Sequence, residues 1–399
     1  MGCFMVGRQP VFDGKLDVRG YGLQFRELEC PPQSGGGVAE LAGLGTDLRS
    51  MVGDKLAFLE ATRAFVVGER ESPFLVPGRT VIEVPRGLPR DREIVGGYRR
   101  LVQEGFALAV KGVAWDSDDE DPVLELASVI KLDTLAIEPA RLAEAVMRAS
   151  AFGVELVAEN VDAPDQFKTC GALGFDLFQG GLLSRPEVAE GEPLSPGRLT
   201  CLQVLRELCD PDMSARKVER TVQTDAALSY RFLRLASEGA ARGMFRPVNS
   251  VREAVVLLGE RRLRSWVSLM MVAGTQDGSN ERLTIAMTRA QMCELMALEL
   301  APRLADSAFT VGLVSALDVL LQVSLPTVLG RMSLAPALED ALLHHAGVLG
   351  NILSDVLIWE AGGYGIGLQS GLCLADAARC YMQAVAWATE VCAVFEMSA

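Results

Sequence analysis

The chain has 399 residues, of which 49% are hydrophobic and 23% are charged, a composition typical of a folded globular protein with two or more domains. Its formal net charge of -14 argues against a nucleic-acid-binding protein, because phosphate binding requires a clustered positive field. Nine cysteines without a CxxC pair indicate reduced thiols, and no unbroken apolar stretch has the length of a membrane span. The sequence therefore predicts a cytoplasmic protein that binds neither nucleic acid nor membrane.

Up to about residue 190, short apolar runs alternate with amphipathic stretches that are typical of helices. The apolar runs lie at residues 16–25, 79–84, 106–113, 128–133, 154–159 and 175–180. Strand, helix and strand at this spacing predict parallel strands joined by crossover helices. We therefore expect residues 1–190 to form a compact, TIM-like β/α barrel, with its site at the carboxyl ends of the strands.

Residues 191–198 contain two prolines and two glycines and are expected to form a linker. Beyond them the apolar residues follow helical spacing, and we find no convincing strand. Ser250 and Glu253, for example, have the spacing of a capping box before an apolar run that stops at Gly259. The sequence predicts an all-helical bundle over residues 199–399.

Counting histidines argues against histidine-based metal chemistry. The chain has two histidines, His344 and His345, which are adjacent and therefore point in different directions on a helix. We expect them on a helix surface or in a core contact, and we expect no metal there.

The chain contains an ordered set of distinctive stretches. They are RQPVFDGKLDVRGYGLQFR, VIEV, VIKLD, AENVD and GFDLFQGGLLSRP in the first half, and LSYRFLRLAS, NSVREAVVLLGERRLRSWVSLMM and AFTVGLVSALDVLL in the second. Taken in order, these stretches resemble the motifs of the EAL–HDOD proteins of bacterial signalling. The first half is similar to an EAL domain, a barrel phosphodiesterase that hydrolyses the second messenger cyclic di-GMP. The second half is similar to an HDOD domain, a helical relative of the HD phosphohydrolases that lacks their metal ligands.

The resemblance implies a pocket in which carboxylate and amide oxygens hold two divalent cations. An active EAL domain reads Glu-x-Leu-x-Arg where this chain reads GLQFR, so Gly22 replaces a metal-binding Glu and Arg26 is kept. Glu60 stands where the family has Asn, and Lys111 and Gly112 stand where it has two tandem Asp residues. The other positions that keep the family's residue are Glu83, Lys131, Asp133, Glu159 and Gln179.

Lys111 suggests what replaces the missing cations. One hypothesis is that its ammonium group pairs with Glu83, Asp133 or Glu60 and so balances acidic groups that otherwise need a metal. The alternative is that Lys111 extends to solvent and the remaining acidic groups are hydrated.

From these replacements we predict that the chain is not an enzyme, and that it has no catalytic residue, metal site or cofactor. The resemblance implies a scaffold or regulator in cyclic di-GMP-related signalling, which binds other signalling proteins through its HDOD-like half. Two alternatives stay open: a sensor that binds cyclic di-GMP without hydrolysing it, and a residual cyclic di-GMP phosphodiesterase.

Overall fold

The computed structural model describes residues 4–27, 48–69, 75–84, 91–112, 122–182, 196–210, 212–225, 228–229, 232, 250–272, 279–321, 324–330, 334–362 and 367–396. The chain forms two compact units. The first comprises Met1–Arg185, Ile358–Gly367 and Cys373–Ala393, and the second comprises Pro186–Leu357, Leu368–Leu372 and Val394–Ala399. Each unit is described by itself below.

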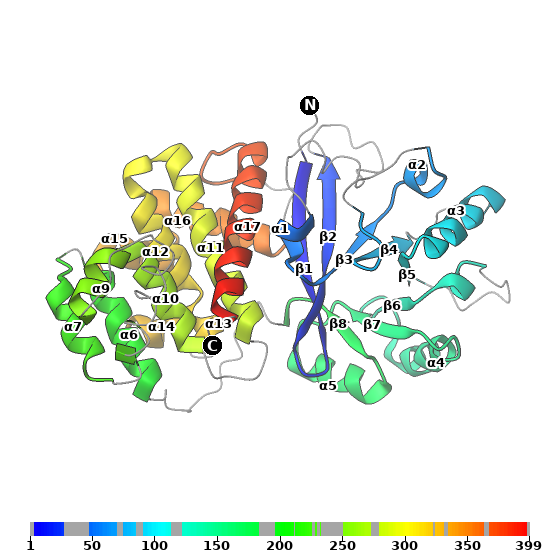
Figure 1. The fold of residues 1–399 in the computed structure, drawn as a ribbon, viewed down its shortest axis with the longest axis horizontal. Coiled ribbons are helices and arrows are strands. Elements are labelled where there is room, and N and C mark those ends of the chain that lie inside the picture. Colours follow the sequence, from blue (N-terminus) through cyan, green and yellow to red (C-terminus); the bar gives the residue numbers. More distant parts are fainter. Residues whose placement is uncertain are drawn as a thin grey trace. The chain divides into compact units, whose positions relative to one another are not determined.

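The first unit contains a closed barrel of eight strands in the order β1 to β8 (Figure 1). The strands β2 to β8 run parallel to one another, and β1 runs antiparallel to both β2 and β8. The predicted β/α barrel is thus confirmed, with one strand, β1, that the sequence analysis did not identify. The strands are β1 (Phe4–Asp13), β2 (Val18–Glu27), β3 (Leu56–Glu60), β4 (Thr80–Val84), β5 (Ala107–Lys111), β6 (Val129–Asp133), β7 (Glu155–Glu159) and β8 (Leu177–Gln179).

A tight turn joins β1 to β2 and makes their antiparallel pairing possible. Asp13 Oδ1 accepts hydrogen bonds from the backbone N–H groups of Lys15, at 2.8 Å, and Asp17, at 3.2 Å. Leu16 in this turn has a φ of 63°, a left-handed conformation that lets the chain reverse within a few residues.

Some helices of the barrel begin or end at residues that favour such positions. For example, Asp91 caps α3 by accepting a hydrogen bond from Ile94 N, and Gly174 ends α5 with a φ of 99°. The helical elements are α1 (Leu48–Val52), α2 (Arg63–Val66), α3 (Arg92–Gln103), η2 (Leu124–Leu126), α4 (Pro139–Ser150) and α5 (Pro164–Leu173).

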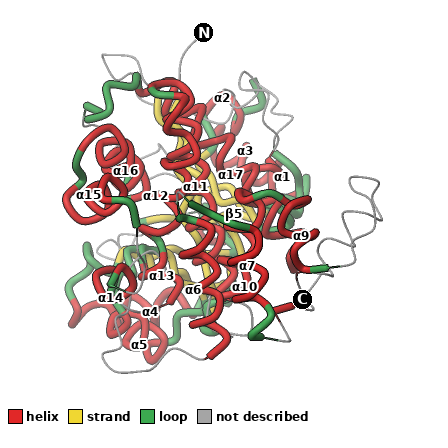
Figure 2. Tube along the Cα trace, turned by 90° about the vertical axis from the view of Figure 1, so that its left-hand side faces the viewer, coloured by secondary structure: helices red, strands yellow, loops and turns green. Residues whose placement is uncertain are grey.

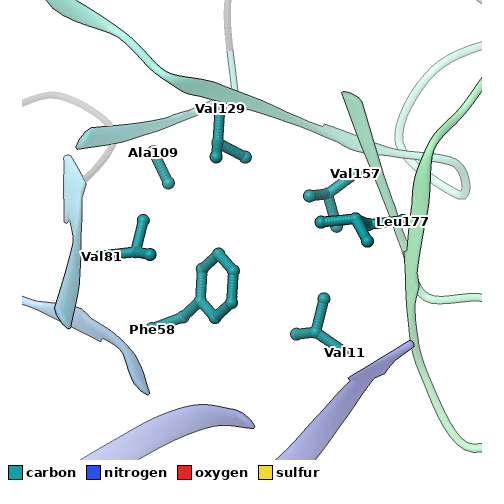
Figure 3. Close-up of a cluster of buried hydrophobic side chains, with 7 residues drawn as sticks. All are labelled: Val11, Phe58, Val81, Ala109, Val129, Val157 and Leu177. Carbon is teal, nitrogen blue, oxygen red and sulfur yellow. The ribbon is translucent and has the colours of Figure 1, made fainter. Parts of the chain in front are cut away.

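An apolar layer fills the interior of the barrel, and we use that name for the seven side chains of Figure 3. Phe58 is the largest of them and projects into the barrel beside side chains from six other strands (Figure 3). All seven are at most 4% exposed, so water is excluded from this level of the barrel. The apolar layer consists of Val11, Phe58, Val81, Ala109, Val129, Val157 and Leu177.

The helix α17 (Leu374–Glu396) lies mostly in the first unit, although the sequence assigns residues 199–399 to the second domain. Arg8 Nη1 on β1 donates to Met51 O at 3.0 Å and to Thr389 Oγ1 on α17 at 3.5 Å. The Arg8 guanidinium also lies 4.1 Å from the centre of the Tyr21 ring. The predicted division therefore differs from the structure at the end of the chain, because helical periodicity does not indicate which surface a helix covers.

The second unit is helical, and the described residues after Gln179 form no strand. Figure 2 colours the helices red and the strands yellow. Ser250 caps α9 by accepting from Glu253 N, and Gly259 follows that helix, as predicted. The helix α6 begins at Pro196, within the predicted linker. The helical elements are α6 (Pro196–Leu208), α7 (Ala215–Val222), α9 (Val251–Leu258), α10 (Glu260–Val272), α11 (Ser279–Leu300), η4 (Pro302–Leu304), α12 (Ala305–Ser315), α13 (Leu317–Leu321), α14 (Leu325–Leu329), α15 (Pro336–His344) and α16 (Gly347–Glu360).

Two stretches of the described residues have the length and apolar composition of a membrane-spanning helix, which the sequence reading did not anticipate. They are Pro302–Leu321 and Pro336–Glu360. In the first stretch, 78% of the apolar window is buried inside the protein, as in a core helix. His345 interrupts the second with a left-handed φ of 52°, and His344 and His345 are both exposed there.

Candidate functional site

A layer of polar side chains lies directly above the apolar layer, toward the carboxyl ends of the parallel strands. Successive side chains of a strand point to opposite faces, so the residue two positions beyond an inward-facing residue also faces inward. Glu60 follows Phe58 in this way, and Lys131 follows Val129. We call these inward-facing residues the polar layer; it consists of Glu60, Glu83, Lys111, Lys131, Glu159 and Gln179, with Gln9 and Gly22 on the antiparallel pair.

Lys131 lies at the centre of the polar layer and is completely buried. Its Nζ donates to Glu83 Oε1 at 2.5 Å and to Gln179 Oε1, and it lies 3.3 Å from Glu159 Oε1. The same Nζ is 5.4 Å from the centre of the Phe58 ring in the apolar layer below. A charge so far from water is stable only where several oxygens surround it, and these side chains supply them.

Lys111 is the second cation of the polar layer, and its side chain is 27% exposed. Its Nζ lies 3.1 Å from Glu83 Oε2, 3.6 Å from Glu159 Oε1 and 3.7 Å from Glu60 Oε1. The three carboxylates come from β4, β7 and β3, so Lys111 joins strands that are not all neighbours in the barrel. The hypothesis that Lys111 pairs with Glu83 or Glu60 matches this geometry, and the alternative of a lysine extended to solvent does not.

The charges of neighbouring groups keep both Glu83 and Lys111 ionised. Burial raises the pKa of Glu83, but the ammonium groups of Lys131 and Lys111 lower it by more, so the pKa lies below its ordinary value of 4.5. Burial lowers the pKa of Lys111, but the carboxylates of Glu83, Glu159 and Glu60 raise it by more, so the pKa lies above its ordinary value of 10.5. Glu83 is therefore a carboxylate, and Lys111 an ammonium group, at neutral pH.

Gly22 leaves room for the side chain of Gln179. A Cβ atom at Gly22 would lie 2.6 Å from Gln179 Nε2, closer than real Cβ atoms approach such a group. Gln179 uses that space to donate from Nε2 to Gln9 Oε1 at 2.9 Å while its Oε1 accepts from Lys131. The position that resembles the family's metal-binding Glu is thus filled by an amide from β8. Sequence reasoning missed Gln9, because it did not identify β1 as a strand.

Asp133 organises the loop after β6. Its Oδ1 accepts hydrogen bonds from Leu135 N at 3.0 Å, Ala136 N at 3.1 Å and Asn160 Nδ2 at 2.9 Å. Asn160 has a φ of 63° and directly follows β7, a role that sequence reasoning also missed. Asp133 thus fixes the connection between β6 and α4.

Two of the predicted site residues have no described place in the cluster. The side chain of Arg26 lies outside the described residues. Gly112 directly follows β5 and has a φ of 63°, a conformation that favours glycine at the turn out of the strand. It contributes no side chain to the polar layer.

The described residues do not fit a pair of divalent cations of the kind that the resemblance implies. Among them, no group of three or more His, Cys, Asp or Glu side chains is arranged to hold a metal ion. The carboxylates of Glu83 and Glu159 instead face the ammonium groups of Lys111 and Lys131. Chemically, the cluster offers one partly exposed cation, Lys111, to an anion, and one half-exposed carboxylate, Glu60, to a proton donor.

Comparison with known proteins identifies a known domain family in the helical half and finds relatives of the whole chain. Residues 196–331 match the HDOD domain family. The chain contains an HDOD domain. The cyclic di-GMP phosphodiesterase CdgJ of Vibrio cholerae is 28% identical, and the match covers 97% of this chain and 92% of that protein. The uncharacterized protein YuxH of Bacillus subtilis is 24% identical over 96% of this chain and 97% of its own. An EAL domain protein of Listeria monocytogenes is 16% identical over 46% of this chain and 88% of its own, with a TM-score of 0.35. The predicted HDOD domain of the helical half is thus confirmed by the family match, and the predicted β/α barrel of the first half by the structure.

The same comparison corrects one prediction. We expected the chain not to be an enzyme, yet a relative that aligns with nearly all of it is named as a cyclic di-GMP phosphodiesterase. Replaced residues are not by themselves evidence of lost activity, because the sequence gives neither the geometry of the site nor the groups that compensate. The prediction of a protein without enzyme activity is therefore withdrawn.

Proposed function

We propose that this protein acts in cyclic di-GMP signalling and binds cyclic di-GMP at the polar layer of its barrel. The observation that carries the proposal is the relative named as a cyclic di-GMP phosphodiesterase, which matches the barrel and the helical half together. In parallel β/α barrels, ligands bind at the carboxyl ends of the strands, which is where the polar layer lies. Hydrolysis of the dinucleotide is the reaction that the relative's name suggests for this site.

The test is a calorimetric titration of the full chain with cyclic di-GMP, with and without Mg²⁺, together with chromatography for the linear product. Glu60→Trp narrows the exposed side of the polar layer, because the Glu60 side chain is 56% exposed at the end of β3. Glu104→Trp is the matched control: Glu104 caps α3 just before β5, at the opposite end of the strands.

We expect saturable binding or turnover by the unchanged chain and by Glu104→Trp. In Glu60→Trp the affinity should fall about tenfold, which corresponds to about 1.4 kcal/mol. Neither binding nor turnover in the unchanged chain, with or without Mg²⁺, would overturn the proposal. Equal affinities in both variants would place the ligand away from the polar layer.

A second candidate function is regulation through protein contacts of the HDOD domain. It rests on the match of residues 196–331 to the HDOD domain family and on the resemblance, which implies protein contacts through that half of the chain. The test is affinity capture with the full chain, with and without cyclic di-GMP. A partner whose recovery changes with the dinucleotide would support this role, and recovery that is the same in both conditions would oppose a link between the two halves.

A further inference from the structure

The polar layer holds a cation of its own. Lys111 Nζ is surrounded by carboxylate oxygens of Glu83, Glu159 and Glu60 at 3.1, 3.6 and 3.7 Å, and these residues come from three different strands. Three converging carboxylate oxygens are the kind of environment that a hard divalent cation prefers. Here an ammonium group lies at the point where they converge.

The Lys111 ammonium group brings the cluster to within one charge of balance. Lys131 already pairs with Glu83 and Glu159, so three carboxylates face two ammonium groups. Without Lys111, three carboxylates would face one ammonium group, an excess that one divalent cation would neutralise. Glu83 and Glu159 are only 7% and 15% exposed, so water screens that excess poorly.

We propose that the Lys111 ammonium group is the resident cation of this site, held by Glu60, Glu83 and Glu159 where a divalent cation would otherwise bind. This arrangement explains why the cluster does not fit two metal ions. The carboxylates already pair with Lys111 and Lys131, and these ammonium groups repel an approaching cation. It also follows that removal of the ammonium group turns the three carboxylates into a divalent-cation site. The three carboxylates would have to move inward by about 0.5–1.7 Å, because hard divalent ions bind oxygen at about 2.0–2.6 Å.

The test uses the full chain, Mn²⁺ as the probe, and no nucleotide, so its outcome is independent of cyclic di-GMP binding. Calorimetry and Mn²⁺ paramagnetic resonance are run on the unchanged chain, on Lys111→Ala and on the control Lys168→Ala, which removes an exposed lysine of α5. We expect Lys111→Ala to bind about one Mn²⁺ ion per chain at least about tenfold more tightly than the other two proteins do. Tight Mn²⁺ binding by the unchanged chain would overturn the inference.

Thermal unfolding supplies a second readout. Lys111→Ala should unfold at a lower temperature than the unchanged chain in EDTA, and Mn²⁺ should restore part of the difference by binding the folded state. The double variant Lys111→Ala/Glu83→Gln should lose both the binding and the restoration, because it lacks one of the three carboxylates. If Lys111→Ala does not fold in EDTA, refolding in Mn²⁺ is measured instead, and failure of Mn²⁺ to promote folding would count against the proposal. Mn²⁺ binding that persists in the double variant would place the ion elsewhere and would also contradict it.

Discussion

The apolar and polar layers of the barrel interior are built from the same strands, two residues apart, yet they are stabilised in different ways. In the apolar layer, side chains such as Phe58 and Leu177 exclude water by packing. In the polar layer, buried Lys131 and Glu83 are stable only as partners, since each would be costly to bury alone. The comparison shows that the polar layer depends on matched charges, so a single change there has effects that a similar loss of volume does not explain.

Lys131→Met is expected to have the largest effect on this comparison. It keeps much of the side-chain volume but removes the ammonium group that contacts Glu83, Glu159 and Gln179. Breaking a buried ion pair lowers the free energy of unfolding by about 3–5 kcal/mol, to be measured by urea denaturation.

Two further variants test whether the loss of stability in Lys131→Met comes from the unpaired charge of Glu83. The control Lys168→Met, on the exposed side of α5, should change the free energy of unfolding by less than about 0.5 kcal/mol. The double variant Lys131→Met/Glu83→Leu should recover much of the loss, because it removes both partners. A Lys131→Met protein as stable as the control would mean that matched charges do not stabilise the polar layer.

Gly22→Ala is expected to have an intermediate effect. The added Cβ would displace the Gln179 amide, which lies 2.6 Å from its position, and would weaken the hydrogen bonds of Gln179 with Gln9 and Lys131. Overpacking of this kind lowers the free energy of unfolding by about 1–3 kcal/mol. The matched control is Gly14→Ala in the turn between β1 and β2, where no atom lies within 4 Å of the added Cβ. Equal stability of the two variants would show that Gln179 has room to move.

The smallest expected effect is on the pH dependence of stability. The pKa of Glu83 in the folded chain lies below its ordinary value of 4.5, so its contribution is present above about pH 4.5 and is lost as the pH falls through the folded-state pKa. Glu83→Gln removes this contribution, so the free energy of unfolding should fall less steeply below pH 4.5 than in the unchanged chain. Urea denaturation at a series of pH values measures both slopes. Parallel slopes would mean that Glu83 is not stabilised by the neighbouring ammonium groups.

The sequence predicts most of the barrel because parallel strands give continuous apolar runs, such as VIKLD in β6. It does not predict β1, in which Pro10 removes a backbone donor and Gly7 and Arg8 interrupt the apolar pattern. The pairing of Pro10 with Tyr21 across an antiparallel hairpin is a tertiary feature. The likeness of this stretch to the EAL family therefore indicated its fold better than its own periodicity did.

The candidate site was predicted in part from the resemblance to the EAL family, which indicated the positions that surround its pocket. Opposite charge at two of these positions, Lys111 and Glu83, then suggested their pairing. The sequence does not give the partner across the barrel: Glu159 reaches Lys111 from β7 although β6 lies between their strands. The sequence also does not give how far along the barrel axis each side chain lies. Asp133 comes two residues after Lys131, so it lies at the end of the strand and accepts hydrogen bonds from the following loop.

The helix α17 also bears on how the protein is made. The first unit includes Met1–Arg185 and Cys373–Ala393, and Arg8 on its first strand bonds to Thr389 on this helix. During synthesis, strands β1 to β8 leave the ribosome long before α17 does, since the chain is produced from its amino end. The surface of the barrel that α17 covers in the folded protein therefore stays exposed to water and to chaperones until the helical half has been translated.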